Sequence, residues 1–254
     1  MDIINIYTDS KQYLAYCKNT DEKIKLHTYI NKTFTVNPFI ILDLGCGNGI
    51  NTSFLADKFP NSVITAIDQS TIQLIVAKNQ NNRTNIVYLH IPFEKFKIDK
   101  KYDFILVSHV LQYIDSDLNG FVKKAISMLR LNGELWFIQQ TKQGMAQIIN
   151  HQQPYLSNPI FDEWKTFEDY KLIITGIIGE EFQITIDYLD SSFNAINFTN
   201  PSEEDKLRLE FIFCLDKSFD EQSEEFKIHL TMFSFGQQDK IFHPNGIIRI
   251  KRIK

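Results

Sequence analysis

Long hydrophobic runs are missing from this chain of 254 residues. No apolar stretch approaches the roughly 20 residues that a membrane-spanning helix needs. Residues 1–5 include no basic segment followed by a long apolar one, so we expect no signal peptide. The three cysteines, Cys17, Cys46 and Cys214, have the spacing of neither a metal site nor a redox pair. These absences predict a soluble cytoplasmic protein with no metal site.

Positive charge is also scarce. The chain has 27 Lys and Arg against 31 Asp and Glu, a formal net charge of -4. Proteins that bind nucleic acid usually present a basic surface to the phosphates. The basic residues of the segment 249–254 alternate with Ile, which predicts a terminal strand with one wet face. We therefore expect a small-molecule substrate and neither a nucleic-acid nor a membrane partner. The sequence leaves a monomer and a homodimer open.

Strands and helices alternate between about residues 38 and 140, which predicts a parallel sheet covered on both faces. The expected strands are 39–44, 63–67, 85–89, 102–107 and 134–138. The first expected helix is 51–59. The second is capped by Ser70 and turns Ile72, Ile75 and Val76 inward. The third begins at Asp115-Ser116-Asp117 and is stopped by Asn132-Gly133.

The rest of the chain has a different pattern. Two short helices are expected before the alternating region, at 10–18 and 21–33. After residue 140 we expect loops and short helices, then β-rich segments at 170–178 and 181–188, helices at 203–215 and 221–232, and a last strand at 246–252.

The most informative segment is residues 40–49, where an apolar run of strand length ends in Asp43 and a turn with Gly45, Gly47 and Gly49. Glycine tolerates positive φ and lets backbone approach a ligand closely. The next helix would aim its N–H groups at the same place. The spacing G-x-G-x-G differs from the G-x-G-x-x-G of dinucleotide sites. Asp43 can accept hydrogen bonds from a cationic group, so a zwitterionic nucleoside suits the turn. A plain tight turn between strand and helix is the alternative.

The segment 42–49, Leu-Asp-Leu-Gly-Cys-Gly-Asn-Gly, resembles the first motif of class I S-adenosylmethionine (SAM) methyltransferases. The resemblance extends over roughly residues 38–140. It implies an α/β fold: a doubly wound, mostly parallel, seven-stranded Rossmann-like sheet with helical cap elements from the N-terminus and the C-terminal half. Residues 1–37 would form a helical lid, 38–140 the SAM-binding core, and 141–254 the rest of the sheet with substrate-cap insertions, all in one integrated domain.

The resemblance also implies a cofactor site. An acid at the end of the second strand, Asp68, can accept from both ribose hydroxyls, or it could merely cap a helix. Family members often have an Asp before a small residue after strand three, whereas this chain has Pro92 and Phe93 there. Adenine recognition is therefore expected from Phe93 with Glu94 or a backbone group. The cofactor-binding candidates are Tyr13, Asp43, Gly45, Cys46, Gly47, Asn48, Gly49, Asp68, Gln69, Phe93, Glu94 and Ser108.

Methyl transfer from SAM, which leaves S-adenosylhomocysteine (SAH), needs mainly alignment and exclusion of water. A nucleophile that still has its proton benefits from a positioned acceptor. His109, just after the fourth strand, is the catalytic candidate. Asp21, Glu22 and His27 are further candidates if the second helix folds over the pocket, although acids in a first helical turn also stabilise the helix dipole. The substrate candidates are Tyr16, Glu22, His109, Gln112 and Tyr113.

A weaker resemblance concerns the acceptor. The chain is similar to the histamine N-methyltransferase-like group in its aromatic N-terminal helices, in residues 111–114, and in the extra helices before the last strand. This resemblance implies N-methylation of an amine or imidazole nitrogen. O-methylation of a phenol or carboxylate is the alternative enzyme function, and a SAM-binding protein without transferase activity is the alternative of another class.

Overall fold

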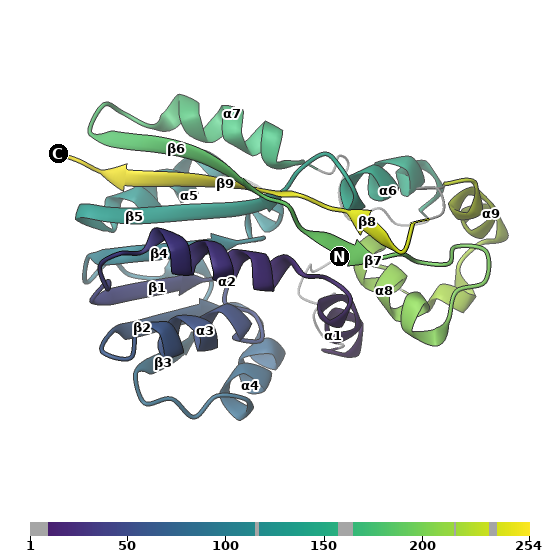
Figure 1. The fold of residues 1–254 in the computed structure, drawn as a ribbon, viewed down its shortest axis with the longest axis horizontal. Helices are drawn as coiled ribbons and strands as arrows, with labels where there is room; N and C mark the ends of the chain where they lie inside the picture. Colours follow the sequence, from purple (N-terminus) through teal and green to yellow (C-terminus); the bar gives the residue numbers. More distant parts are fainter. Residues whose placement is uncertain (1–9, 115–116, 157–164, 216, 234–237) are drawn as a thin grey trace.

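The computed structural model describes residues 10–114, 117–156, 165–215, 217–233 and 238–254. Its main sheet has seven strands in the order β3-β2-β1-β4-β5-β9-β6 (Figure 1). The first five strands run parallel, and β9 runs antiparallel to both β5 and β6, which confirms the predicted fold class. The strands are β1 Ile40–Leu44, β2 Val63–Asp68, β3 Ile86–His90, β4 Tyr102–Ser108, β5 Leu129–Gln140, β6 Phe182–Leu189 and β9 Asn245–Arg252.

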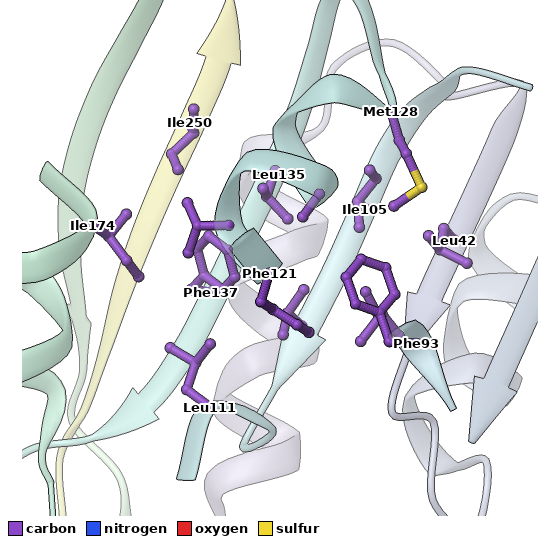
Figure 2. Packing of buried hydrophobic residues seen from close by; sticks show 14 of the residues in the cluster. Leu42, Phe93, Ile105, Leu111, Phe121, Met128, Leu135, Phe137, Ile174 and Ile250 are labelled. Carbon is purple, nitrogen blue, oxygen red and sulfur yellow. The ribbon is translucent and has the colours of Figure 1, made fainter. Parts of the chain in front are cut away.

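Helices cover both faces of the sheet, and successive residues of a strand point to opposite faces. Ile41 packs with the helices α2 Glu22–Thr33 and α3 Ile50–Lys58, whereas Leu42 packs in the cluster of α5 Leu118–Ser127. Figure 2 shows part of this second cluster, with Phe121 of α5 lying over the strands. Helices α4 Thr71–Asn79 and α7 Phe167–Ile177 complete the two layers.

A cap lies at the carboxyl ends of the parallel strands (Figure 1). It consists of α1 Ser10–Lys18, α6 Met145–Gln152, α8 Glu203–Phe213, α9 Glu224–Met232 and a small sheet of β7 Ser192–Asn194 and β8 Lys240–Phe242. Short 3-10 turns are Phe93–Lys95, Leu111–Tyr113, Gln153–Tyr155 and Phe219–Glu221. The cap has its own apolar core, in which Tyr16, Phe193 and Leu209 are buried. Across the described part of the chain, no helix combines the length and the apolar character that crossing a membrane requires.

The prediction of a β-rich segment at 170–178 is wrong, because these residues belong mostly to α7. The helix begins at a capping box: the Thr166 N–H donates to Asp169 Oδ2 at 2.8 Å. Tyr170 and Ile174, four residues apart, are both buried against the sheet. A short apolar run has no clear period, so the capping residues decide its structure here.

The expected end of the helix that begins near Asp117 is also wrong. Asn132-Gly133 does not end a helix, because α5 ends at Ser127 and Gly133 lies within β5. A Cβ on Gly133 would lie 2.8 Å from the Tyr102 carbonyl oxygen, so close strand packing explains this glycine. Asp117 caps α5, and residues 115 and 116 lie outside the described residues.

The inner face of α4 also differs from the expected one. Ile72 and Ile75 are 37% and 53% exposed, whereas Gln73, Leu74 and Ala77 are buried. The helix is therefore rotated by about one residue relative to the expectation, and its apolar residues alone do not identify the buried face.

Candidate functional site

The loop after β1 is shaped by glycines with positive φ. Gly45, Gly47 and Gly49 have φ values of 74°, 52° and 80°. A Cβ on Gly45 would lie 2.3 Å from Val110 Cγ2, so this position must remain free of a side chain. A Cβ on Gly47 would meet nothing within 4 Å. Gly45 therefore packs tightly against the segment after β4, while Gly47 faces open space.

Asp68, the last residue of β2, stabilises this loop through hydrogen bonds. Its Oδ2 accepts the Gly47 N–H at 2.8 Å, and its Oδ1 accepts the Ser70 N–H at 2.8 Å. Burial raises the pKa of Asp68, and the backbone hydrogen bonds from Ser70 and Gly47 oppose that effect. The half-buried carboxylate lies on the wall of a pocket that the loop borders.

Asp43 has a different position. It is 2% exposed and accepts a hydrogen bond of 2.5 Å from the Thr52 hydroxyl of α3. Burial raises the pKa of Asp43 to about 6. The residue lies beneath the loop, where it joins β1 to α3, and it does not line the pocket.

The pocket is bordered by the sheet on one side and by the cap on the other. Apart from Asp43 and Gly49, every cofactor candidate lines it: Tyr13, Gly45, Cys46, Gly47, Asn48, Asp68, Gln69, Phe93, Glu94 and Ser108. All substrate candidates line it as well: Tyr16, Glu22, His109, Gln112 and Tyr113. Sequence reasoning missed Lys23, Gln140, Met145, Phe211 and Ile212, which also line it. No local motif marks these five residues.

The segment after β3, where Pro92 and Phe93 replace the residues that are common in the family, has a packing role. Phe93 is buried and packs against Phe121, with 4.6 Å between the ring centroids (Figure 2). Lys124 Nζ donates to the carbonyl oxygens of Phe93 and Glu94 at 2.6 and 3.0 Å. These contacts fix the turn Phe93–Lys95 at the pocket wall, and the Glu94 side chain remains exposed.

A buried charge cluster lies where α2 meets the end of β4. Glu22 Oε1 lies 2.9 Å from His109 Nε2 and 3.0 Å from Lys23 Nζ. Burial alone would raise the pKa of Glu22, but His109 and Lys23 outweigh it and hold that pKa well below its usual range. His109 has a left-handed backbone, with φ 55°, and its N–H donates to the Ile138 carbonyl at 3.0 Å. If Nε2–H donates to Glu22, Nδ1 bears the lone pair of the neutral ring.

The other candidates on α2 have structural contacts. Asp21 Oδ1 accepts the Ser192 N–H at 2.7 Å, which attaches α2 to β7. His27 Nε2 lies 3.1 Å from Asn51 Oδ1, and its ring stacks on Phe54. Neither Asp21 nor His27 lines the pocket.

A second histidine, His243, is fully buried next to the cluster. Its Nδ1 accepts the Met145 N–H at 3.3 Å. Burial lowers the pKa of His243 to about 4, although Glu22 acts in the opposite direction. Because the neutral ring is the form that the fold accommodates, protonation must oppose folding.

We expect His243 to make the protein acid-sensitive. Its pKa is 6.5 in an ordinary setting and about 4 in the fold, so the unfolded chain binds the extra proton between these values. The contribution of the neutral His243 ring to the free energy of unfolding is fully present above pH 6.5. It decreases as the pH falls towards 4, by up to about 3 kcal/mol. In His243→Asn, whose amide oxygen can still accept from Met145, urea unfolding should lose less free energy between pH 7 and 4. An equal loss in both proteins would contradict this role. Asp43, whose pKa is raised in the fold, changes the stability with pH in the opposite direction, but it does so equally in the wild type and in the variant, so it does not affect the comparison.

Comparisons with known proteins agree with this geometry. Residues 41–133 match the family model described as a methyltransferase domain. A malonyl-[acyl-carrier protein] O-methyltransferase of Acetivibrio thermocellus is 34% identical over 129 residues, which are 51% of this chain and 45% of that protein. A ubiquinone biosynthesis O-methyltransferase of Rickettsia typhi is 32% identical over 114 residues, 44% and 43% of the two chains. The chain thus spans less than half the length of these curated relatives.

Solved structures show the same fold at low identity. The N-methyltransferase NodS of Bradyrhizobium japonicum in complex with SAH has a TM-score of 0.55 at 14% identity, over 91% of this chain and 87% of that one. The plantazolicin methyltransferase BpumL in complex with SAH has a TM-score of 0.56 at 16% identity, over 98% and 88%. The finer resemblance to the histamine N-methyltransferase-like group stays a prediction. In residues 41–133 the chain is thus similar to methyltransferase domains, and its fold is that of the SAH-bound methyltransferases named above.

Proposed function

We propose that the protein binds SAM in this pocket and transfers its methyl group to a small molecule. The main support is the joint position of the glycine loop, Asp68 and the Glu22–His109 pair on one pocket. Buried polar atoms there also suit a polar ligand: Asn48 Nδ2 and Ser108 Oγ have no hydrogen-bond partner among the described residues. The open space at Gly47 is compatible with a ligand lying against the loop.

The proposed roles follow the arrangement of the walls. Asp68 would accept from the ribose hydroxyls, since a carboxylate has lone pairs beyond those used by Gly47 and Ser70. Gln69, Phe93 and Glu94 would line the adenine. The loop residues Cys46 and Asn48, with Ser108 and Tyr13, would line the amino-acid end.

Bound SAM supplies a methyl group on a positively charged sulfur, which is already a good leaving group. The chain must then align the acceptor and exclude water. Tyr16 and Phe211, whose ring centroids lie 5.0 Å apart, close the pocket from the cap side. His109 Nδ1 would accept the proton of the acceptor while Glu22 holds the ring in place and stabilises its charged form.

The charge cluster favours an amine as the acceptor. Glu22 is ionised and only 2% exposed, so water screens its field weakly, and the Lys23 ammonium 3.0 Å away offsets only part of it. A negative charge attracts a cationic amine and repels a second carboxylate. We therefore propose N-methylation, with a hydroxyl as the second candidate because both curated relatives named above are O-methyltransferases. A neutral hydroxyl could give its proton to the same imidazole.

The first test is cofactor binding. Isothermal titration should detect SAM and SAH but not NAD, and NAD binding alone would refute the proposal. The second test supplies labelled SAM with matched amines, phenols and carboxylic acids. Transfer only to phenols or acids would refute the amine assignment, and SAH binding without transfer to any acceptor would favour a non-catalytic SAM-binding protein.

A further inference from the structure

One amide at the end of β5 is buried in the pocket, and no described residue pairs with it. Gln140 is 1% exposed and lines the pocket, yet neither its Nε2 nor its Oε1 has a hydrogen-bond partner among the residues that the structure describes. The preceding residue differs in its nitrogen: Gln139 Nε2 donates to Gln112 Oε1 at 2.9 Å, while Gln139 Oε1 also has no partner among the described residues. Gln140 therefore presents a free donor and a free acceptor to whatever fills this part of the pocket.

The strand geometry places this amide near the charge cluster. The Ile138 carbonyl accepts the His109 N–H, and Gln140 lies two residues further along the same strand. Residues two apart on a strand share a face. Ile138 packs with Leu26 and Ile30 of α2, the helix that begins at Glu22. Gln140 thus lies on the sheet face that α2 covers.

The hydrogen-bonding needs of this amide discriminate between ligands. A buried polar group left without a partner costs about 1–3 kcal/mol. A carboxylate offers only acceptors and an ammonium only donors. An amide offers one of each and can pair with Gln140 through two parallel hydrogen bonds. Water can satisfy the same atoms in the free protein and be displaced by such a group.

We propose that Gln140 selects the methyl acceptor, and that this acceptor is an amine that also has a carboxamide group. The carboxamide pairs with Gln140 while the nucleophilic nitrogen lies at His109. Met145, Phe211 and Ile212 provide apolar walls for the remainder of the molecule. This inference rests on the proposed function, because it concerns the acceptor of that reaction.

The test compares two acceptors of one carbon skeleton, leucinamide and leucine methyl ester. Wild-type protein with labelled SAM should methylate leucinamide with a kcat/KM at least about tenfold above that of the ester, which lacks the N–H. In Gln140→Met, which keeps the length but removes both polar atoms, this ratio should fall to near one with SAH affinity unchanged. Gln183→Met, the same change at an exposed residue of β6, should keep the wild-type ratio.

Two measurements distinguish a failure of the role of Gln140 from a failure of the proposed function. Calorimetric titration of leucinamide into the SAH complex reports recognition without turnover. If SAH binds but leucinamide does not, or if Gln140→Met leaves the amide-to-ester ratio unchanged, the role of Gln140 is wrong while the proposed function stands. If SAH itself does not bind, the proposed function fails first.

Discussion

Replacing Glu22 by Gln is expected to lower kcat/KM for methyl transfer by about 100-fold, within the range that general acid–base groups contribute. The amide keeps the size of the side chain but loses the charge that faces His109 Nε2 at 2.9 Å. The imidazolium formed when His109 takes the proton of the acceptor then has no counter-charge. Initial rates with labelled SAM and an amine acceptor measure the effect. SAH affinity should change by less than about threefold, because Glu22 belongs to the acceptor side of the pocket in our assignment.

A double-mutant cycle shows whether Glu22 and His109 act as a unit. If they do, His109→Asn combined with Glu22→Gln should lose little more activity than the worse single variant. Fully multiplicative losses would contradict the assignment, as would a Glu22→Gln protein of normal activity. Glu225→Gln makes the same chemical change at an exposed residue of α9 and should be neutral. Thermal unfolding of each variant shows whether Lys23, which loses its carboxylate partner, destabilises the fold.

The sequence predicts the part of the molecule whose determinants are local. The apolar run before Asp43 and the glycine spacing after it are sufficient to place β1, its loop and α3, because backbone conformation there depends on adjacent residues. The seven-stranded α/β architecture followed from the alternation of elements together with the family resemblance. The same reasoning failed at α7, where a capping box rather than the apolar content sets the structure.

Pocket residues contributed by tertiary packing could not be predicted in this way. Phe211 lies on α8 and reaches the pocket because α8 packs against α1, about 200 residues earlier in the chain. Gln140 looks like an ordinary strand end until the fold shows that no described residue pairs with its two amide atoms. Asp43 shows the opposite case: its position beside the glycines indicates a ligand contact, yet Thr52 occupies its carboxylate beneath the loop.

Replacing Asp68 by Asn is expected to weaken SAH binding by about 10- to 100-fold, or roughly 1–3 kcal/mol. Both carboxylate oxygens already accept backbone N–H groups, from Gly47 and Ser70 at 2.8 Å each. An amide must turn its NH2 towards one of these donors, so the loop loses a hydrogen bond and the ribose hydroxyls lose an acceptor. Calorimetric titration of SAH measures the change.

The control separates the ligand contact from the support of the loop. Ser70, which also lines the pocket, caps α4 through its side chain, which accepts the Gln73 N–H at 3.3 Å, so Ser70→Ala weakens the same turn while the Asp68 carboxylate keeps its charge. If Asp68 contacts the ribose, Asp68→Asn must weaken SAH more than Ser70→Ala at equal loss of thermal stability. Equal affinities for the two variants would mean that Asp68 acts only by holding the loop. An unchanged affinity in Asp68→Asn would remove the residue from the cofactor site, because a half-buried carboxylate that contacts the ligand cannot lose its charge without consequence.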